Sequence, residues 1–188
     1  ARAEEGCDAL AAGVEFYRRV RAMEGALPRP VFRLLKFGKF TSGTVCNALS
    51  DHTHMEGSLR AFQDEVFYSL RAGIVSIGKE IERSFGCTVS IYMNDGYPAV
   101  MNPPELHKRV RKAVGFFEMD KPSMITEDFS WYQKEVPGVF AFAGCGTPGR
   151  KCYPNHHPKF EIEESALADG VLLHLAAVVS AMHRKKEE

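Results

Sequence analysis

The sequence has no excess of charge of either sign and no long hydrophobic run. Its 24 Lys and Arg residues cancel its 24 Asp and Glu residues, so we expect no broad basic field that would bind nucleic acid. The most apolar stretch, residues 171–182, is about a dozen residues long and contains His174, whereas a membrane span needs ~20 residues. This stretch therefore predicts a buried helix, and we expect no membrane partner.

We also expect neither a paired set of cysteines nor a signal peptide. The five cysteines are widely spaced and odd in number, which excludes a secreted disulfide framework and favours a reducing compartment. The opening ARAEEGCDAL has no basic start followed by an apolar run. We therefore expect a cytoplasmic protein.

The composition is that of a globular chain. Hydrophobic residues make up 45% and charged residues 26% of the 188 positions, close to the soluble average. The length fits one large domain or two small ones.

The first hundred residues show the pattern of an α+β domain. Three- and four-residue apolar steps predict helices, while β-branched and aromatic runs predict strands. The expected elements are a helix over 6–22, strands over 31–40 and 53–62, a helix over 64–85 and a strand over 87–92. This order lacks only the opening strand of the βαββαβ layout, in which a four-stranded antiparallel sheet carries two helices on one face.

A second unit begins after Asn102-Pro103-Pro104. It is expected to contain a helix marked by residues 106–117, an acidic helix start at Glu127 and Asp128, a strand over 138–144 and a last helix over 163–183. A single strand has no second strand to form hydrogen bonds with the backbone N–H and C=O groups along its edges. The second unit therefore looks like part of a larger domain.

Several polar residues have two interpretations each. Cys145, Cys152, His156 and His157 form either a zinc site or, because their spacing is not that of a zinc finger, an ordinary surface loop. Arg60 is either a clamp for a carboxylate or a partner in a surface ion pair.

For two further groups the structural interpretation is preferred. His52 and His54 share one face of a strand and could chelate a metal, but exposed histidines are the favoured reading. Glu127 and Asp128 could be catalytic carboxylates, but acids also favour the first turn of a helix.

Four ordered segments resemble the metal-dependent amidohydrolase family that includes aminoacylases, hippurate hydrolases and plant auxin-conjugate hydrolases. ARAEEGCDAL is similar to the family's SRPEEG-x-x-AL, and GTVCNALSDHTHMEGSLRAF to its GGTAxNVIPDxAxMxGTxRtF. MITEDFSWYQKEVPGVFAFAG resembles MxxEDFsxfxxxvPGxFfxlG, and NHHPKFEIEESALADGV resembles the closing H-[HNS]-P-x-F-x-[IV]-x-E-x-aLxxG-v.

The resemblance implies an α/β fold in which a zinc-peptidase-like catalytic domain is interrupted by a βαββαβ lid that also dimerises. Residues 1–100 would be this ferredoxin-like lid without its first strand, and residues 101–188 the C-terminal part of the catalytic domain. The family's HxDxxP, Gly-His-Asp and Glu-Glu segments, which supply most metal ligands and the general base, would precede these residues. We therefore expect no catalytic residue in this chain.

The same resemblance implies three site residues. His156 occupies the family's C-terminal metal-ligand position, and His157 is not expected to bind metal. Asn47 and Arg60 match a pair of lid residues that bind the carboxyl end or carbonyl of the substrate. In relatives, this pair comes from the partner subunit. The chain departs from the family pattern at Ala48, Ser50 and Ser58, where Val, Pro and Thr are expected.

The expected activity is metal-dependent hydrolysis of the amide bond of N-acyl or N-aroyl amino acids or short peptides by a homodimer. The resemblance implies two divalent metal ions, zinc first, with manganese, cobalt or nickel as alternatives. A hypothesis of a different class is that the chain by itself is a non-catalytic dimerisation and substrate-binding module.

Overall fold

The computed structural model describes residues 6–28 and 31–182 of the chain. Contacts between residues divide it into two units. The first unit runs to Ala99 and adds Pro122–Thr126, and the second consists of Val100–Lys121 and the residues from Glu127 onward. Each unit is described separately.

The first unit contains a helix, a β-hairpin and a second helix. The elements are α1 (Ala9–Gly25), β1 (Arg33–Ser42), β2 (Thr53–Ala61) and α2 (Asp64–Phe85). α1 begins after Asp8, whose carboxylate accepts hydrogen bonds from the backbone N–H groups of Leu10 and Ala11 at 3.0 Å. α2 ends at Gly86, whose φ of 66° is the left-handed conformation that glycine adopts without strain.

The hairpin is antiparallel, with Arg33 opposite Ala61 and Ser42 opposite Thr53. Its register shifts between Phe37 and Lys39, so Gly38 forms a β-bulge. β1 and β2 pair only with each other among the described residues.

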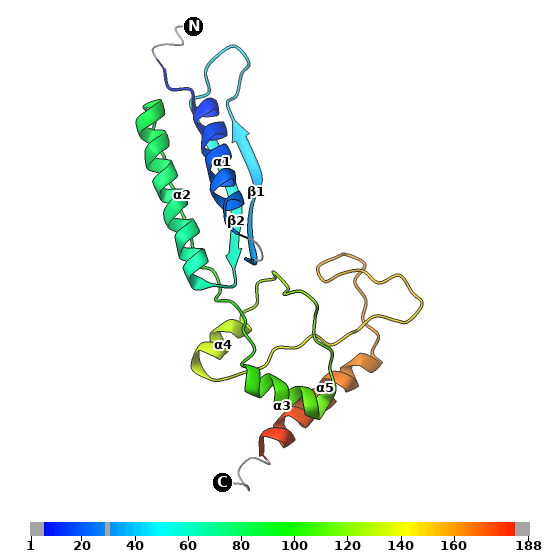
Figure 1. The fold of residues 1–188 in the computed structure, drawn as a ribbon. Helices are drawn as coiled ribbons and strands as arrows, with labels where there is room; N and C mark the ends of the chain where they lie inside the picture. Colours follow the sequence, from blue (N-terminus) through cyan, green and yellow to red (C-terminus); the bar gives the residue numbers. More distant parts are fainter. Residues whose placement is uncertain (1–5, 29–30, 183–188) are drawn as a thin grey trace. The chain divides into compact units, whose positions relative to one another are not determined.

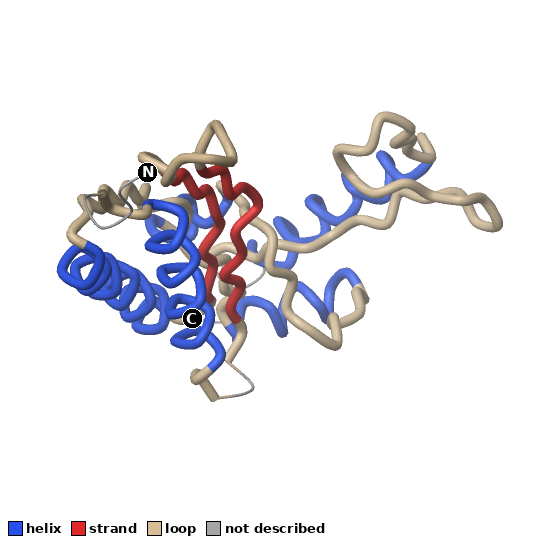
Figure 2. The backbone as a smooth tube through the Cα atoms, turned by 90° about the horizontal axis from the view of Figure 1, so that it is seen from above, coloured by secondary structure: helices blue, strands red, loops and turns tan. Residues whose placement is uncertain are grey.

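The core of the first unit lies between the hairpin and the two helices. α1 and α2 lie side by side and antiparallel (Figure 1), and both cover the same face of the hairpin (Figure 2). Val20 is fully buried, Ile81 is 1% exposed and Leu35 is 5% exposed. Burial of each such side chain stabilises the fold by about 1.5–3 kcal/mol.

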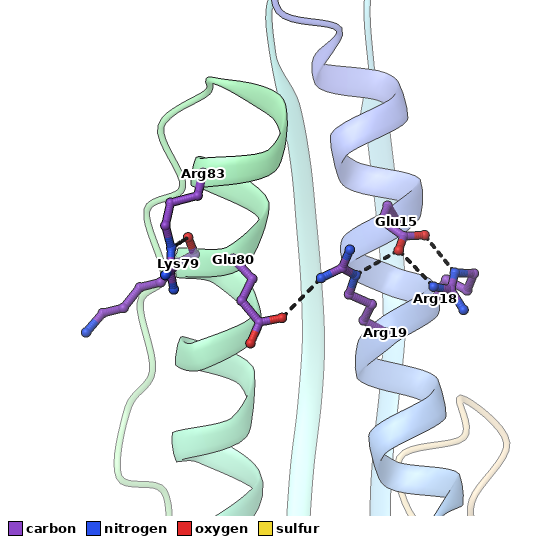
Figure 3. Close-up of polar contacts among 6 residues, drawn as sticks. All are labelled: Glu15, Arg18, Arg19, Lys79, Glu80 and Arg83. Carbon is purple, nitrogen blue, oxygen red and sulfur yellow. Dashed lines mark hydrogen bonds and ion pairs between the residues drawn. The ribbon is translucent and has the colours of Figure 1, made fainter.

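A charged contact joins the two helices near their middle (Figure 3). The Arg19 guanidinium donates to Glu15 at 2.7 Å and reaches Glu80 on α2 at 3.1 Å. Arg18 also donates to Glu15, at 2.6 and 2.8 Å. The hydrogen bonds from Arg18 and Arg19 lower the pKa of the Glu15 carboxyl to about 2.

The second unit contains three helices: α3 (Pro104–Val114), α4 (Phe129–Glu135) and α5 (Ser165–Met182). α3 packs against α5. The helix predicted after Pro104 is shorter than expected, since it ends at Gly115 with φ 77° and leaves Phe117 94% exposed.

Both strands predicted outside the hairpin are wrong. Residues 87–92 and 138–144 belong to no β-ladder. Residues 87–93 nevertheless alternate between half-buried and exposed side chains, and Cys87, Val89, Ile91 and Met93 pack against the core. The sequence pattern of a strand is present, but the described residues supply no neighbouring strand to complete a ladder.

The prediction of a buried last helix is also wrong. None of the residues of α5 is buried, and His174, expected in a core, is exposed with its Nδ1 2.8 Å from the carbonyl oxygen of Gly170. Within the described part of the chain, α5 alone has the length and apolar composition of a membrane-crossing helix, features that a core helix of a soluble domain shares. His183, at the predicted helix end, lies outside the described residues.

Candidate functional site

Arg60 lies near the open end of the hairpin, opposite Leu34. Its Nη1 donates to the carbonyl oxygen of Met124, in the segment that returns to the first unit. The structure thus anchors Arg60 by a backbone carbonyl, and no acid forms an ion pair with it in the described ranges. The prediction of a surface ion pair finds no support.

Asn47 lies in the exposed loop at the opposite end of the hairpin, between Ser42 and Thr53. Arg60 lies seven positions after Thr53 along β2, which corresponds to about 23 Å at the rise of a β-strand. The structure therefore does not bring Asn47 and Arg60 of one chain together.

Ser50 fixes the shape of the Asn47 loop. Its side chain is 8% exposed, forms a 2.7 Å hydrogen bond with the Ser42 hydroxyl and donates to the carbonyl oxygen of His52 at 2.9 Å. Its own carbonyl accepts from the N–H of Ala9 at 3.0 Å, which ties the loop to the start of α1. The two hydroxyl contacts are ones that the proline of the family pattern could not make, a role of Ser50 that the sequence did not reveal.

His52 and His54 stack with ring centroids 6.5 Å apart. His54 Nε2 lies 2.8 Å from Glu56, which also accepts from Lys39 at 2.6 Å. The hydrogen bond from Lys39 and, after it, that from His54 lower the pKa of the Glu56 carboxyl. These residues form a charged cluster on the surface, in agreement with the prediction that both histidines are exposed.

His156 lies in the loop between Cys145 and α5, which we call the His156 loop (residues 146–162). Its φ is 69°, and it is the one non-glycine residue with positive φ in the described ranges. A non-glycine residue held in the left-handed region costs about 1–3 kcal/mol and is typical of functional sites. This backbone geometry singles out the residue that the resemblance identifies as a metal ligand.

His157 is engaged in the local structure of the loop. Its Nδ1 accepts from the N–H of Lys159 at 3.0 Å, and its ring stacks on Tyr153 with centroids 4.4 Å apart. The nitrogen that accepts this bond is not free to bind a metal. The structure thus gives the two adjacent histidines different environments.

Cys145, which precedes the loop, and Cys152, within it, do not complete a metal site. Cys145 is half-buried and Cys152 exposed, and both are free thiols. In the part of the chain that the structure describes, no three His, Cys, Asp or Glu side chains come together as metal ligands. The local zinc site predicted as one alternative is therefore not formed among the described residues.

Glu127 and Asp128 precede α4, as expected for acids at a helix start. The Glu127 carboxylate accepts from the N–H of Phe129 at 3.4 Å, and its carbonyl accepts from the Ser130 hydroxyl at 2.8 Å. The structural role of Glu127 is sufficient to explain its position.

Comparisons with known proteins agree on one family. The protein family described as "Peptidase family M20/M25/M40" matches residues 3–180 of this chain. N-acetyldiaminopimelate deacetylase from Streptococcus thermophilus is 30% identical over 177 residues, which cover 89% of this chain and 45% of that protein. Thermostable carboxypeptidase 1 from Saccharolobus solfataricus is 31% identical over 143 residues, covering 73% of this chain and 36% of that protein.

Solved structures show the same fold. A protein from methicillin-resistant Staphylococcus aureus, described as an aminohydrolase, superposes with a TM-score of 0.81 at 28% identity, over 95% of this chain and 47% of that one. The Bacillus subtilis YXEP protein, described as a dinuclear metal-binding peptidase of the M20 family, superposes with a TM-score of 0.71 at 24% identity, over 93% and 47%. The α/β class is confirmed, and the chain belongs to peptidase family M20/M25/M40. It spans about half the length of the curated relatives that it matches.

Proposed function

We propose that this chain is the lid and C-terminal catalytic segment of a metal-dependent amidohydrolase acting on N-acyl or N-aroyl amino acids or short peptides. The observation that carries this is His156, which the fold holds at positive φ and which lies at the ligand position of the family's closing motif. Relatives named as a deacetylase and a carboxypeptidase support amide substrates with a carboxyl group.

The finer fold proposal is a βαββαβ lid over residues 1–100. Residues 87–93 turn alternate side chains onto the core without pairing with β2. A strand from outside this chain, between β2 and residues 87–93, would complete both ladders. The free edge of β1 would then remain for a second copy of the lid.

Two divalent ions, zinc first, would be held by His156 and by ligands outside this chain, as in the relative described as dinuclear metal-binding. Such ions polarise an amide carbonyl and lower the pKa of a bound water. A neutral imidazole on an exposed loop is a suitable ligand. A single imidazole binds weakly, so the 188-residue chain alone should hold no stoichiometric metal at His156.

The activity test uses the protein that includes the half of the M20 fold preceding this chain. Loaded with zinc, manganese or cobalt, it is expected to release the amino acid from N-acetyl or N-benzoyl amino acids. His156→Ala should remove most of this activity and the metal, whereas the matched variant His157→Ala should cost far less. Absence of metal-dependent release from every substrate would refute the proposal.

The proposed homodimer explains the separation of Asn47 and Arg60. Antiparallel pairing of two β1 edges places the Asn47 loop of one protomer at the open hairpin end of its partner, where the partner's Arg60 lies. An amide donor and a guanidinium from two chains could then bind one substrate carbonyl and carboxylate. Arg60→Ala should lower kcat/KM by roughly 10- to 150-fold without changing the metal content.

Mixing two impaired variants tests this arrangement. In a dimer of Asn47→Ala with Arg60→Ala, one composite site carries both substitutions and the other neither, so a random mixture should recover about a quarter of wild-type activity. If both residues of a site came from one chain, the mixture would be no more active than the single variants. That result would refute the shared site.

A second candidate, a non-catalytic dimerisation and substrate-binding module, is favoured by the absence of a complete ligand set among the described residues. Light scattering with an activity assay on the 188-residue chain separates the two. The module hypothesis expects a dimer without turnover even when the preceding half is supplied, whereas the amidohydrolase proposal expects turnover to appear with that half.

A further inference from the structure

The His156 loop is closed at its base by Glu163. The N–H of Glu163 donates to the carbonyl oxygen of Cys145 at 2.8 Å. Its carboxylate accepts from the Thr147 hydroxyl at 3.0 Å. Both side chains are half-buried, so this contact is better shielded from water than those of the exposed charges around it.

The turn that carries His156 has its own internal hydrogen bonds. The N–H of His157 donates to Pro154 at 3.1 Å, and the N–H of Phe160 donates to His157 at 2.9 Å. These bonds fix the turn itself but do not connect it to a helix. A rigid turn on an open loop would move as a body.

Glu163 supplies that connection. Its carbonyl accepts from the N–H of Ala166 at 2.9 Å, in the first turn of α5. One residue therefore joins the start of α5, the chain at Cys145 and the loop at Thr147.

We propose that Glu163 and Thr147 form a clasp that positions the His156 loop on α5 and so keeps the His156 imidazole in place for metal binding. Glu163 is thus a positioning residue, and this inference rests on the proposed function. A ligand that must meet a metal within a few tenths of an ångström gains from a loop held at its base.

The primary test measures hydrogen exchange of the amides at the base of the loop in the 188-residue chain, those of Arg150, Glu163 and Ala166, which donate to Thr147, Cys145 and Glu163. Loss of the clasp in Glu163→Ala or Thr147→Val should accelerate exchange there by about 3- to 10-fold, because it removes the net stabilisation of about one hydrogen bond. The double variant should exchange no faster than either single one, because both remove the same contact. Glu163→Gln keeps an acceptor oxygen and should exchange more slowly than Glu163→Ala.

Glu161→Ala is the matched control. Glu161 is exposed in the same loop and makes no hydrogen bond or ion pair with the rest of the described chain. Equal exchange in Glu161→Ala and Glu163→Ala would overturn the clasp. Thr147→Val, which changes no charge, keeps the test valid if Glu163→Ala does not fold.

The second readout is zinc affinity and kinetics in the longer protein. The clasp variants should bind zinc about 3- to 10-fold more weakly and lower kcat with little change in KM. Unchanged zinc affinity, with faster loop exchange, would refute the positioning role. If the longer protein hydrolysed no amide while the exchange results held, the proposed function would fail and the clasp would stand.

Discussion

Replacing Gly78 with alanine tests whether residues 87–93 pack on α2 as the lid proposal requires. Gly78 is a buried glycine within α2. A Cβ at this position would meet Ile91 Cδ1 at 2.7 Å and Val89 Cγ1 at 3.4 Å. The first distance is too short for two non-bonded carbon atoms, and the second is a close van der Waals contact.

Two effects of opposite sign determine how much Gly78→Ala changes the stability of the first unit. Alanine in a helix interior is about 1 kcal/mol more favourable than glycine, whereas overpacking a core costs about 1–3 kcal/mol. Gly78→Ala alone should therefore destabilise the first unit by about 1 kcal/mol. Ile91→Val removes the Cδ1 that clashes, so in that background Gly78→Ala should stabilise by about 1 kcal/mol, a coupling of about 2 kcal/mol.

Native-state hydrogen exchange of the α2 amides measures the stability of the first unit separately from the second. Gly25→Ala in α1 is the matched control, because its added Cβ meets nothing within 4 Å, and its effect should be the same with Ile or Val at position 91. If Gly78→Ala had the same effect in both backgrounds within about 0.3 kcal/mol, Ile91 would not pack on Gly78 and residues 87–93 would not be part of the lid.

Two further predictions concern titratable groups. The pKa of Glu15 is lowered from 4.5 to about 2 by Arg18 and Arg19, so these contacts contribute stability above pH 4.5 that is lost as the pH falls through about 2. Carboxyl NMR titration should show this midpoint, Arg19→Gln should raise it, and a midpoint near 4.5 in the native protein would contradict the contacts. Burial, and after it the neighbouring Cys7, raises the pKa of the Cys87 thiol, so iodoacetamide at pH 8 should modify Cys87 about ten-fold or more slowly than the exposed Cys46. Equal rates by peptide mass spectrometry would refute this.

The local part of the fold was predictable because its signals lie in neighbouring residues. The stripe from Phe67 to Phe85 and the stop at Gly86 predict a helix over 64–85, and α2 has these bounds. The hairpin strands also lie within a few residues of their predicted positions. Amphipathic helices and hairpins bury their apolar faces against near neighbours in sequence, so one segment of chain contains most of the information.

The candidate site was only partly predictable. The closing motif predicts His156 as a metal ligand, whereas the positive φ of this residue and the hydrogen bond between Glu163 and Thr147 depend on contacts across a long loop that leave no periodic trace in the sequence. The separation of Asn47 from Arg60 follows from the hairpin register, whereas the motif alone suggested a pair.

Residues 138–144 show why a segment with the sequence pattern of a strand is not a strand. A ladder requires backbone neighbours, and here side-chain amides take their place. Asn102 accepts from the N–H of Phe140 at 2.8 Å and donates to its carbonyl at 2.9 Å, the same two bonds that a paired strand residue would make. Gln133 donates to the carbonyl of Gly138 at 2.8 Å and bonds both backbone groups of Met101. These amides satisfy the backbone groups of single residues rather than of a whole edge, so no continuous ladder forms along this segment.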